Sequence, residues 1–237
     1  MPPNSPAAPI DLPQTLAQLP LFSDMVPQEL AELAKGCQLQ RLDRGEGVFR
    51  FGDPCHSFHV VLQGQVKLFR LSPAGQEKII ELLGPGATFG EALMFTDRPY
   101  IVNAQALAPT LLLNVGKAAV LAEIARDSRF ALRMLAGMSR RMHRLVNDVQ
   151  GYALLSGVQR VIGYLLHEME AREGEAPAPD GKVALSYSKS MIASRLSITP
   201  EYFSRILRDL EDHGLIQVDG RNIHIQDTAR LAQYLAM

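Results

Sequence analysis

The sequence predicts an α+β protein: an N-terminal antiparallel β-roll of the jelly-roll type, a long helix, and a C-terminal winged helix-turn-helix. Three observations support this fold class. Short alternating apolar runs separated by turn residues fill the first half of the chain. A heptad pattern of apolar residues follows, and two short helical patterns with a hairpin signal come last. At 237 residues, with 47% hydrophobic and 21% charged residues, the chain is long enough for two domains.

The β-roll is predicted to span residues 16–122, with short helices beside it. Residues 1–15 are predicted to be a mobile tail, because the first residues are rich in Pro and Ala. Apolar residues from Leu16 to Leu33 have helical spacing that Pro20 and Pro27 interrupt, which indicates short helices. The six predicted strands are Gly47–Phe51, Phe58–Leu62, Val66–Leu71, Lys78–Leu83, Ile101–Leu107 and Leu111–Val115.

A long helix is predicted over residues 123–151. Its apolar residues recur at alternating steps of four and three, which is typical of a coiled-coil seam. We expect this seam to meet its copy in a homodimer, although the β-roll of the same chain could also cover it. The predicted dimer-interface residues are Ala131, Leu135, Met138, Met142, Leu145 and Val149.

Residues 152–237 are predicted to form the winged helix-turn-helix. A helix over 158–169 and a polar loop over 171–181 precede the two short helices. Thr199 can cap the second of these, and Pro200 and Glu201 suit its first turn. Ser197 occupies the turn position that glycine commonly holds. Two alternating runs around Asp219-Gly220 then predict a β-hairpin, the wing.

The outward residues of the second helix suit contact with DNA bases. A guanidinium can bind guanine bidentately, a carboxylate accepts from cytosine, and a hydroxyl serves several bases. Residues 187–208 include four basic residues and one acidic residue, which gives this segment a charge of +3 in a chain of net charge −1. An ordinary pair of surface helices is the alternative. The predicted DNA-binding residues are Ser188, Lys189, Thr199, Pro200, Glu201, Ser204, Arg205 and Arg221.

Other function classes find little support in the sequence. No signal peptide or apolar run of about 18 residues is present, so we expect a cytoplasmic protein without a membrane anchor. Cys37 and Cys55 are too few for an iron–sulfur cluster held by four cysteines of one chain. His56 and His59 are three apart and would point to opposite faces of a strand, which argues against a metal-dependent enzyme. A pure scaffold protein would leave the base-contacting set unexplained.

The order of β-roll, long helix and winged helix-turn-helix resembles the CRP/FNR superfamily of bacterial transcription regulators. The most specific stretches are GPGATFGEALMF, FRLSPAGQEKIIELLGPG and PEYFSRILRDLE, and Glu201-x-x-Ser204-Arg205 is similar to the FNR-branch signature. The resemblance implies a dimer with a cyclic-nucleotide-binding-like domain, with double-stranded DNA and RNA polymerase as partners. It further implies TTGAT-type inverted repeats, with Arg205 at guanine, Glu201 at the opposite cytosine and Ser204 near thymine.

The resemblance also bears on the signal. Tyr100 and Ile101 stand where the cyclic-nucleotide branch has its phosphate-binding Arg-Ser or Arg-Thr pair, which argues against a cyclic-nucleotide sensor and leaves that reading as the alternative. The predicted effector pocket is apolar apart from one acid and comprises Leu83, Phe89, Gly90, Glu91, Leu93, Met94, Phe95, Tyr100 and Ile101.

Similarity is greatest to the Dnr-type regulators, which implies a nitric oxide or low-oxygen signal sensed through haem, without an iron–sulfur cluster. The paired histidines of that type fall on about Leu19 and Pro20 here, so an axial ligand would have to come from elsewhere. The candidate ligands are Cys55, His56, His59 and Met94. Each has a structural alternative: His59 as a solvent-facing strand residue, Cys55 and His56 as a turn, and Met94 as a core residue.

Overall fold

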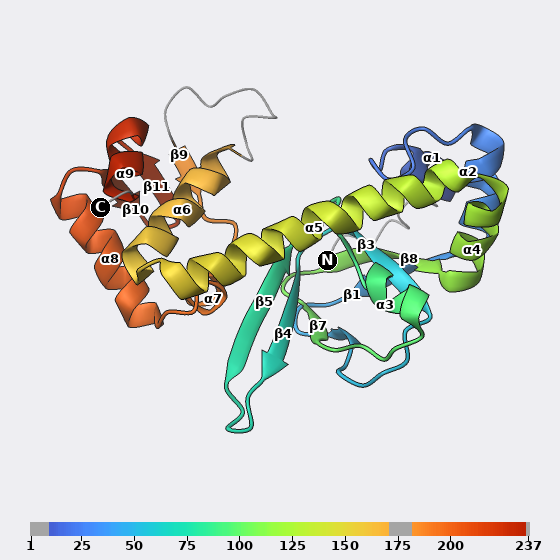
Figure 1. The fold of residues 1–237 in the computed structure, drawn as a ribbon, viewed down its shortest axis with the longest axis horizontal. Coiled ribbons are helices and arrows are strands. Elements are labelled where there is room, and N and C mark those ends of the chain that lie inside the picture. Colours follow the sequence, from blue (N-terminus) through green and yellow to red (C-terminus); the bar gives the residue numbers. More distant parts are fainter. Residues whose placement is uncertain (1–9, 171–181, 236–237) are drawn as a thin grey trace, which may run out of the picture. The chain divides into compact units, whose positions relative to one another are not determined.

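The computed structural model describes residues 10–170 and 182–235, and the chain divides into two compact units (Figure 1). The N-terminal unit comprises Met1–Arg70 and Glu81–His143, and the C-terminal unit comprises Leu71–Ile80 and Arg144–Met237. Each has its own hydrophobic core. No helix in the described part of the chain is long and apolar enough to cross a membrane.

Two four-stranded antiparallel sheets form the β-roll. The first has the order β1-β8-β3-β6 and the second β2-β7-β4-β5. The strands of the first sheet are β1 (Cys37–Leu42), β3 (Ser57–Gln63), β6 (Thr88–Phe89) and β8 (Thr110–Gly116). Those of the second are β2 (Gly47–Phe49), β4 (Val66–Leu71), β5 (Glu77–Leu83) and β7 (Asn103–Ala106). The predicted α+β class is confirmed, and all six predicted strands are present: β4 has the predicted bounds, and the other five have shifted ends.

Four short helices flank the β-roll, and a long one follows: α1 (Leu12–Ala17), α2 (Pro27–Ala34), α3 (Glu91–Thr96), α4 (Lys117–Arg126) and α5 (Ser128–Leu154). Asp11 caps α1 by accepting from the Gln14 N–H, and Leu16 is fully buried. The chain is therefore helical from Leu12, inside the predicted tail. Residues 1–9 lie outside the described part.

The long helix begins later than predicted. Asp127 is extended, and its carboxylate accepts from the backbone N–H of Arg129 at 3.0 Å and also binds the Arg129 guanidinium. This local bonding separates α4 from α5. Residues 123–126, predicted as the start of the long helix, therefore end α4 instead.

The C-terminal unit contains α6 (Gly157–Glu170), β9 (Lys182–Ala184), α7 (Lys189–Arg195), α8 (Pro200–Asp212), β10 (Ile216–Asp219), β11 (Asn222–Ile225) and α9 (Thr228–Leu235). Its sheet has the order β10-β11-β9. The buried faces of α7 and α8 meet in the core, as the helical spacing predicts. The predicted polar loop over 171–181 lies outside the described residues.

Candidate DNA-binding surface and effector cavity

Helix α8 separates a buried face from an exposed one. Thr199 caps it by accepting from the Tyr202 N–H at 3.2 Å, and Pro200 occupies the first position. The buried face packs in the core through Phe203, Ile206, Leu207 and Leu210. Pro200, Glu201, Ser204 and Arg205 are all exposed. The structure thus brings together the four α8 residues that the sequence predicts to contact bases.

One further exposed residue, Tyr202, belongs to this surface. The Arg205 guanidinium lies 5.7 Å from the centre of the Tyr202 ring, which is close enough for a cation–π contact. The Ser204 hydroxyl donates to the Pro200 carbonyl at 2.9 Å. Tyr202 could not be predicted from the sequence as a surface residue, because an aromatic residue at helical spacing resembles a core residue.

The turn between α7 and α8 has an uncommon backbone conformation. Ser197 has a φ of 56°, in the left-handed region that favours glycine. The Lys78 ammonium group, which belongs to the C-terminal unit, donates to the Ser197 hydroxyl at 2.7 Å and to the Arg195 carbonyl at 3.2 Å. Burial and the nearby Arg195 lower the pKa of Lys78 to about 8. This side chain thus binds the carbonyl end of α7, a role that sequence analysis missed.

The remaining predicted DNA-binding residues lie at the edges of this surface. Ser188 caps α7 by accepting from the Met191 N–H, and Lys189 is the first residue of that helix. Arg221 is exposed in the two-residue turn that joins β10 to β11. Gly220, the other turn residue, has a φ of 59°, which suits the tight hairpin turn that the Asp-Gly pair predicts.

The predicted dimer seam lies along α5 and is largely exposed. Leu135, Met142, Leu145 and Val149 expose 53%, 60%, 40% and 65% of their surface, and Ala131 and Met138 are partly buried. Different residues of α5, Phe130 and Met134, pack into the core of the N-terminal unit. Most of the seam is therefore not covered by its own β-roll.

The residues predicted to form the effector pocket include both buried core residues and exposed ones. Phe89 and Met94 are fully buried core residues, Leu83 is buried, and Leu93 packs against the same core. Phe95 and Ile101 are exposed. Gly90 has a φ of 89° and is the N-cap residue of α3. Tyr100 stacks on Phe49 with ring centres 3.5 Å apart.

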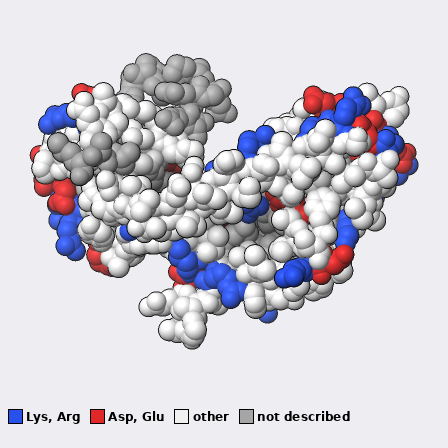
Figure 2. Space-filling model, viewed as in Figure 1, with Lys and Arg blue, Asp and Glu red and all other residues white. Residues whose placement is uncertain are grey.

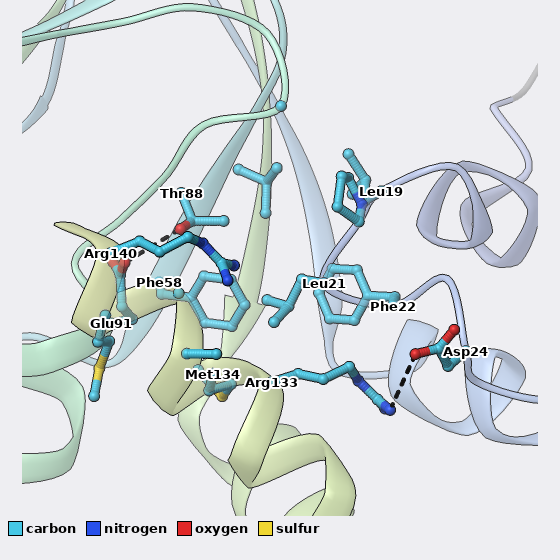
Figure 3. A pocket seen from close by; sticks show the side chains of 16 residues that line it. Leu19, Leu21, Phe22, Asp24, Phe58, Thr88, Glu91, Arg133, Met134 and Arg140 are labelled. Atoms are coloured by element: carbon cyan, nitrogen blue, oxygen red, sulfur yellow. Dashed lines mark hydrogen bonds and ion pairs between the residues drawn. The ribbon is translucent and has the colours of Figure 1, made fainter. Parts of the chain in front are cut away.

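A cavity of about 360 Å³ lies beside α5 (Figure 3). Its walls come from α5, the segment between α1 and α2, strand β3, strand β6 with the residues before it, and the first residue of α3. Of the nine predicted pocket residues, it shares only Glu91. The lining residues are Leu19, Pro20, Leu21, Phe22, Asp24, Phe58, Val60, Gly86, Thr88, Glu91, Arg133, Met134, Ala136, Gly137, Met138 and Arg140.

Glu91 is fixed by its neighbours. One carboxylate oxygen accepts from the Thr88 hydroxyl at 3.2 Å, and the other lies 3.5 Å from the Arg141 guanidinium. Arg141 also forms an ion pair with Glu81 at 2.5 Å. This network ties the start of α3 to α5, and it already occupies the carboxylate and the guanidinium that a ligand near Gly90 would need.

The candidate haem ligands lie outside this cavity. His59 is buried, with Nδ1 2.7 Å from Asn114 Oδ1 and Nε2 3.1 Å from Tyr100 Oη, so its structural reading as a solvent-facing residue is wrong. Strand β3 is buried on both faces, so its residues do not alternate between buried and exposed as they would in a strand with one face in solvent. Burial lowers the pKa of His59. Met94 is a core residue, Cys55 is buried, and His56 is exposed.

Comparison with known proteins agrees with this architecture. Residues 39–127 match the family described as cyclic nucleotide-binding domain, and residues 159–234 match the Crp-like helix-turn-helix domain. The transcriptional activator protein anr of Pseudomonas aeruginosa is 30% identical over 94% of this chain and 88% of its own. A cAMP-activated CRP-like global transcriptional regulator of Mycobacterium tuberculosis is 26% identical over 93% of this chain and 98% of its own.

Solved structures give the same picture. The sensor domain of the regulator DNR from Pseudomonas aeruginosa is 40% identical, with a TM-score of 0.51, over 56% of this chain and 90% of that one. FixK2 from Bradyrhizobium japonicum has the same fold, with a TM-score of 0.73 and 22% identity, over 83% of this chain and 96% of its own. By its two matched domains and its full-length relative, the chain belongs to the CRP/FNR family of DNA-binding transcription regulators.

Proposed function

We propose that the protein is a homodimeric regulator that binds TTGAT-type inverted repeats. The observation that supports this most strongly is the exposed face of α8, where Glu201, Ser204 and Arg205 lie on adjacent turns of a capped helix. Arg205 would bind guanine, Glu201 would accept from the opposite cytosine, and Ser204 would lie near thymine. Arg221 would contact the phosphate backbone from the wing, and Ser188 and Lys189 from the start of α7.

The exposed seam of α5 supports the homodimer. Four large apolar side chains in regular heptad spacing lose contact with water only when another surface covers them. Figure 2 shows uncharged side chains along much of α5 with Lys or Arg side chains at its edges, whereas charges of both signs gather around α2 and α4. A second copy is the occupant that an inverted DNA repeat requires, since two half-sites need two linked recognition helices.

Substitution of Arg205 tests the proposal. Because one bidentate contact contributes about 1–3 kcal/mol of discrimination and a dimer makes it twice, Arg205→Ala should abolish the preference for the inverted repeat over scrambled DNA. Fluorescence anisotropy at two salt concentrations would measure it. Lys189→Ala is the matched control: it should weaken binding to both DNAs and flatten the salt dependence. Equal loss on both DNAs from Arg205→Ala would show that α8 does not contact bases specifically.

For the signal, we propose nitric oxide or low oxygen, with promoters of denitrification or anaerobic respiration and RNA polymerase as the partners. Support comes from similarity to the regulators named anr and DNR. Haem remains a prediction, and the cavity does not fit it well. Leu19 and Pro20 line the cavity where the Dnr type has histidines, and its lining includes no His or Cys. Of the four candidate ligands, only His56 is exposed.

Absorption spectroscopy of protein from haem-supplemented cells tests the cofactor. A stoichiometric Soret band that is lost in His56→Ala and kept in His143→Ala would support haem ligation by His56. His143 is a suitable control because it is also exposed and belongs to α5. Protein without a Soret band would rule haem out as the sensor group.

A further inference from the structure

The cavity beside α5 combines an apolar wall with two arginines from one helix. Phe22 and Phe58 are fully buried, and together with Leu21 they form the apolar side that faces α5 (Figure 3). Arg133 and Arg140 come from α5, two turns apart, and both line the cavity. An apolar wall with a few converging polar groups is typical of a small-molecule site.

The two arginines of this cavity have few partners within the protein. Arg140 is exposed and forms no hydrogen bond or ion pair with any residue that the structure describes, and Figure 3 shows its guanidinium directed toward the space beside Phe58. The Arg133 Nε atom is buried without a hydrogen-bond partner, and its guanidinium lies 3.9 Å from the largely exposed carboxylate of Asp24. A buried donor without a partner is costly, and an acceptor supplied by a ligand would remove that cost.

The acids of the cavity do not balance these two arginines. Glu91 is already bonded to Thr88 and Arg141, a residue that does not line the cavity. Asp24 meets Arg133 only at the limit of an ion pair, with 75% of its side chain exposed. A negatively charged group would therefore be attracted to the space between Arg140 and the apolar wall.

We propose that this cavity binds a small organic anion: a carboxylate, sulfonate or phosphate on a compact apolar body. The acid group would bind Arg140 bidentately, as a guanidinium favours, and the body would lie against Phe58, Leu21 and Phe22. The inference that an anion binds depends only on the residues of the cavity. The anion's role as the effector of DNA binding rests on the proposed function.

Fluorescence titration of the full-length protein without DNA tests the site. The probe is 8-anilinonaphthalene-1-sulfonate, an aromatic anion whose emission rises in apolar surroundings. Arg140→Leu should weaken its binding about tenfold or more, because a charge-assisted contact is lost while the volume is kept. Arg144→Leu, the same change one turn further along α5 and outside the cavity, should leave binding unchanged. N-phenyl-1-naphthylamine, which lacks the sulfonate, should bind wild type and Arg140→Leu equally.

A second variant tests the cavity without changing its charge. Gly137 lines the cavity, and a side chain there would meet open space, so Gly137→Leu should fill the cavity and abolish probe binding. Gly163→Leu is the control, since Gly163 is also a helical glycine with open space around it, in α6. Thermal unfolding would confirm that both variants fold.

Competition identifies the apolar body of the ligand. Displacement of the probe by decanoate supports a linear body, and displacement by 1-naphthoate supports an aromatic one. Three results would each overturn the proposal: unchanged affinity in Arg140→Leu, unchanged affinity in Gly137→Leu, or failure of both carboxylates to displace the probe. None of these depends on DNA, so the site can fail while the proposed regulator function stands, and the reverse also holds.

Discussion

At the scale of single residues, the burial of His59 makes the stability of the fold depend on pH. Burial lowers its pKa, so the imidazole stays neutral in the folded protein when an unfolded chain would take up a proton. The contribution of His59 to the free energy of unfolding should therefore be constant above a pH of about 6.5, the ordinary histidine value, and fall as the pH drops below it. Urea unfolding between pH 5 and 8 would measure this.

His59→Gln should flatten that slope, since glutamine keeps a polar side chain but does not titrate in this range. His143→Gln, at an exposed position, should retain the slope of the wild type. A slope that His59→Gln leaves intact would mean that other groups cause the acid sensitivity.

Ser197 presents a second residue-scale test. Its left-handed backbone costs a non-glycine residue about 1 kcal/mol, whereas glycine adopts that conformation freely. Both Ser197→Gly and Ser197→Ala remove the hydroxyl that accepts from Lys78, but only glycine relieves the strain. We therefore expect Ser197→Gly to be about 1 kcal/mol more stable than Ser197→Ala in urea unfolding. Equal stabilities would indicate that the turn changes conformation without the hydroxyl.

At the scale of elements, the seam of α5 can be tested by charge. Met142→Glu would place like charges face to face in an apolar interface, at a cost of about 3 kcal/mol or more, which is roughly a hundredfold in the dimer Kd. Sedimentation should show monomer, and affinity for the inverted repeat should fall. His143→Glu adds a neighbouring charge off the seam and should leave the dimer intact. A dimer that withstands Met142→Glu would mean that another surface joins the subunits.

The elements also show what a sequence can predict. Strands such as β4 and the recognition helix α8 follow from local signals, namely alternation, a Thr cap and a first-turn Pro. Strand β6 has two residues and no periodicity, so it could not be predicted. The cavity is harder still, because Leu21, Phe58 and Arg140 meet there only through tertiary packing. The same holds for Lys78, whose partners lie more than 110 residues away in the sequence.

At the scale of the whole molecule, a ligand can alter DNA affinity only if it binds one arrangement of the dimer more tightly than another. Cyclic AMP is the ligand to exclude first, because the relative from Mycobacterium tuberculosis is named as cAMP-activated. Tyr100 is buried and stacked on Phe49, and its hydroxyl donates to the Ser57 carbonyl at 3.1 Å. This position therefore supplies no guanidinium for a cyclic phosphate.

We expect millimolar cyclic AMP to change neither the melting temperature nor the affinity for the inverted repeat. A ligand at a hundred times its Kd would stabilise the fold by about 2.7 kcal/mol, which a melting curve resolves easily. Tyr100→Arg tests the reason, because a guanidinium at this position would supply the missing contact, and any stabilisation by cyclic AMP should appear only in that variant. Clear stabilisation of the wild type would instead restore the cyclic-nucleotide sensor, with the phosphate bound by groups other than those at Tyr100 and Ile101.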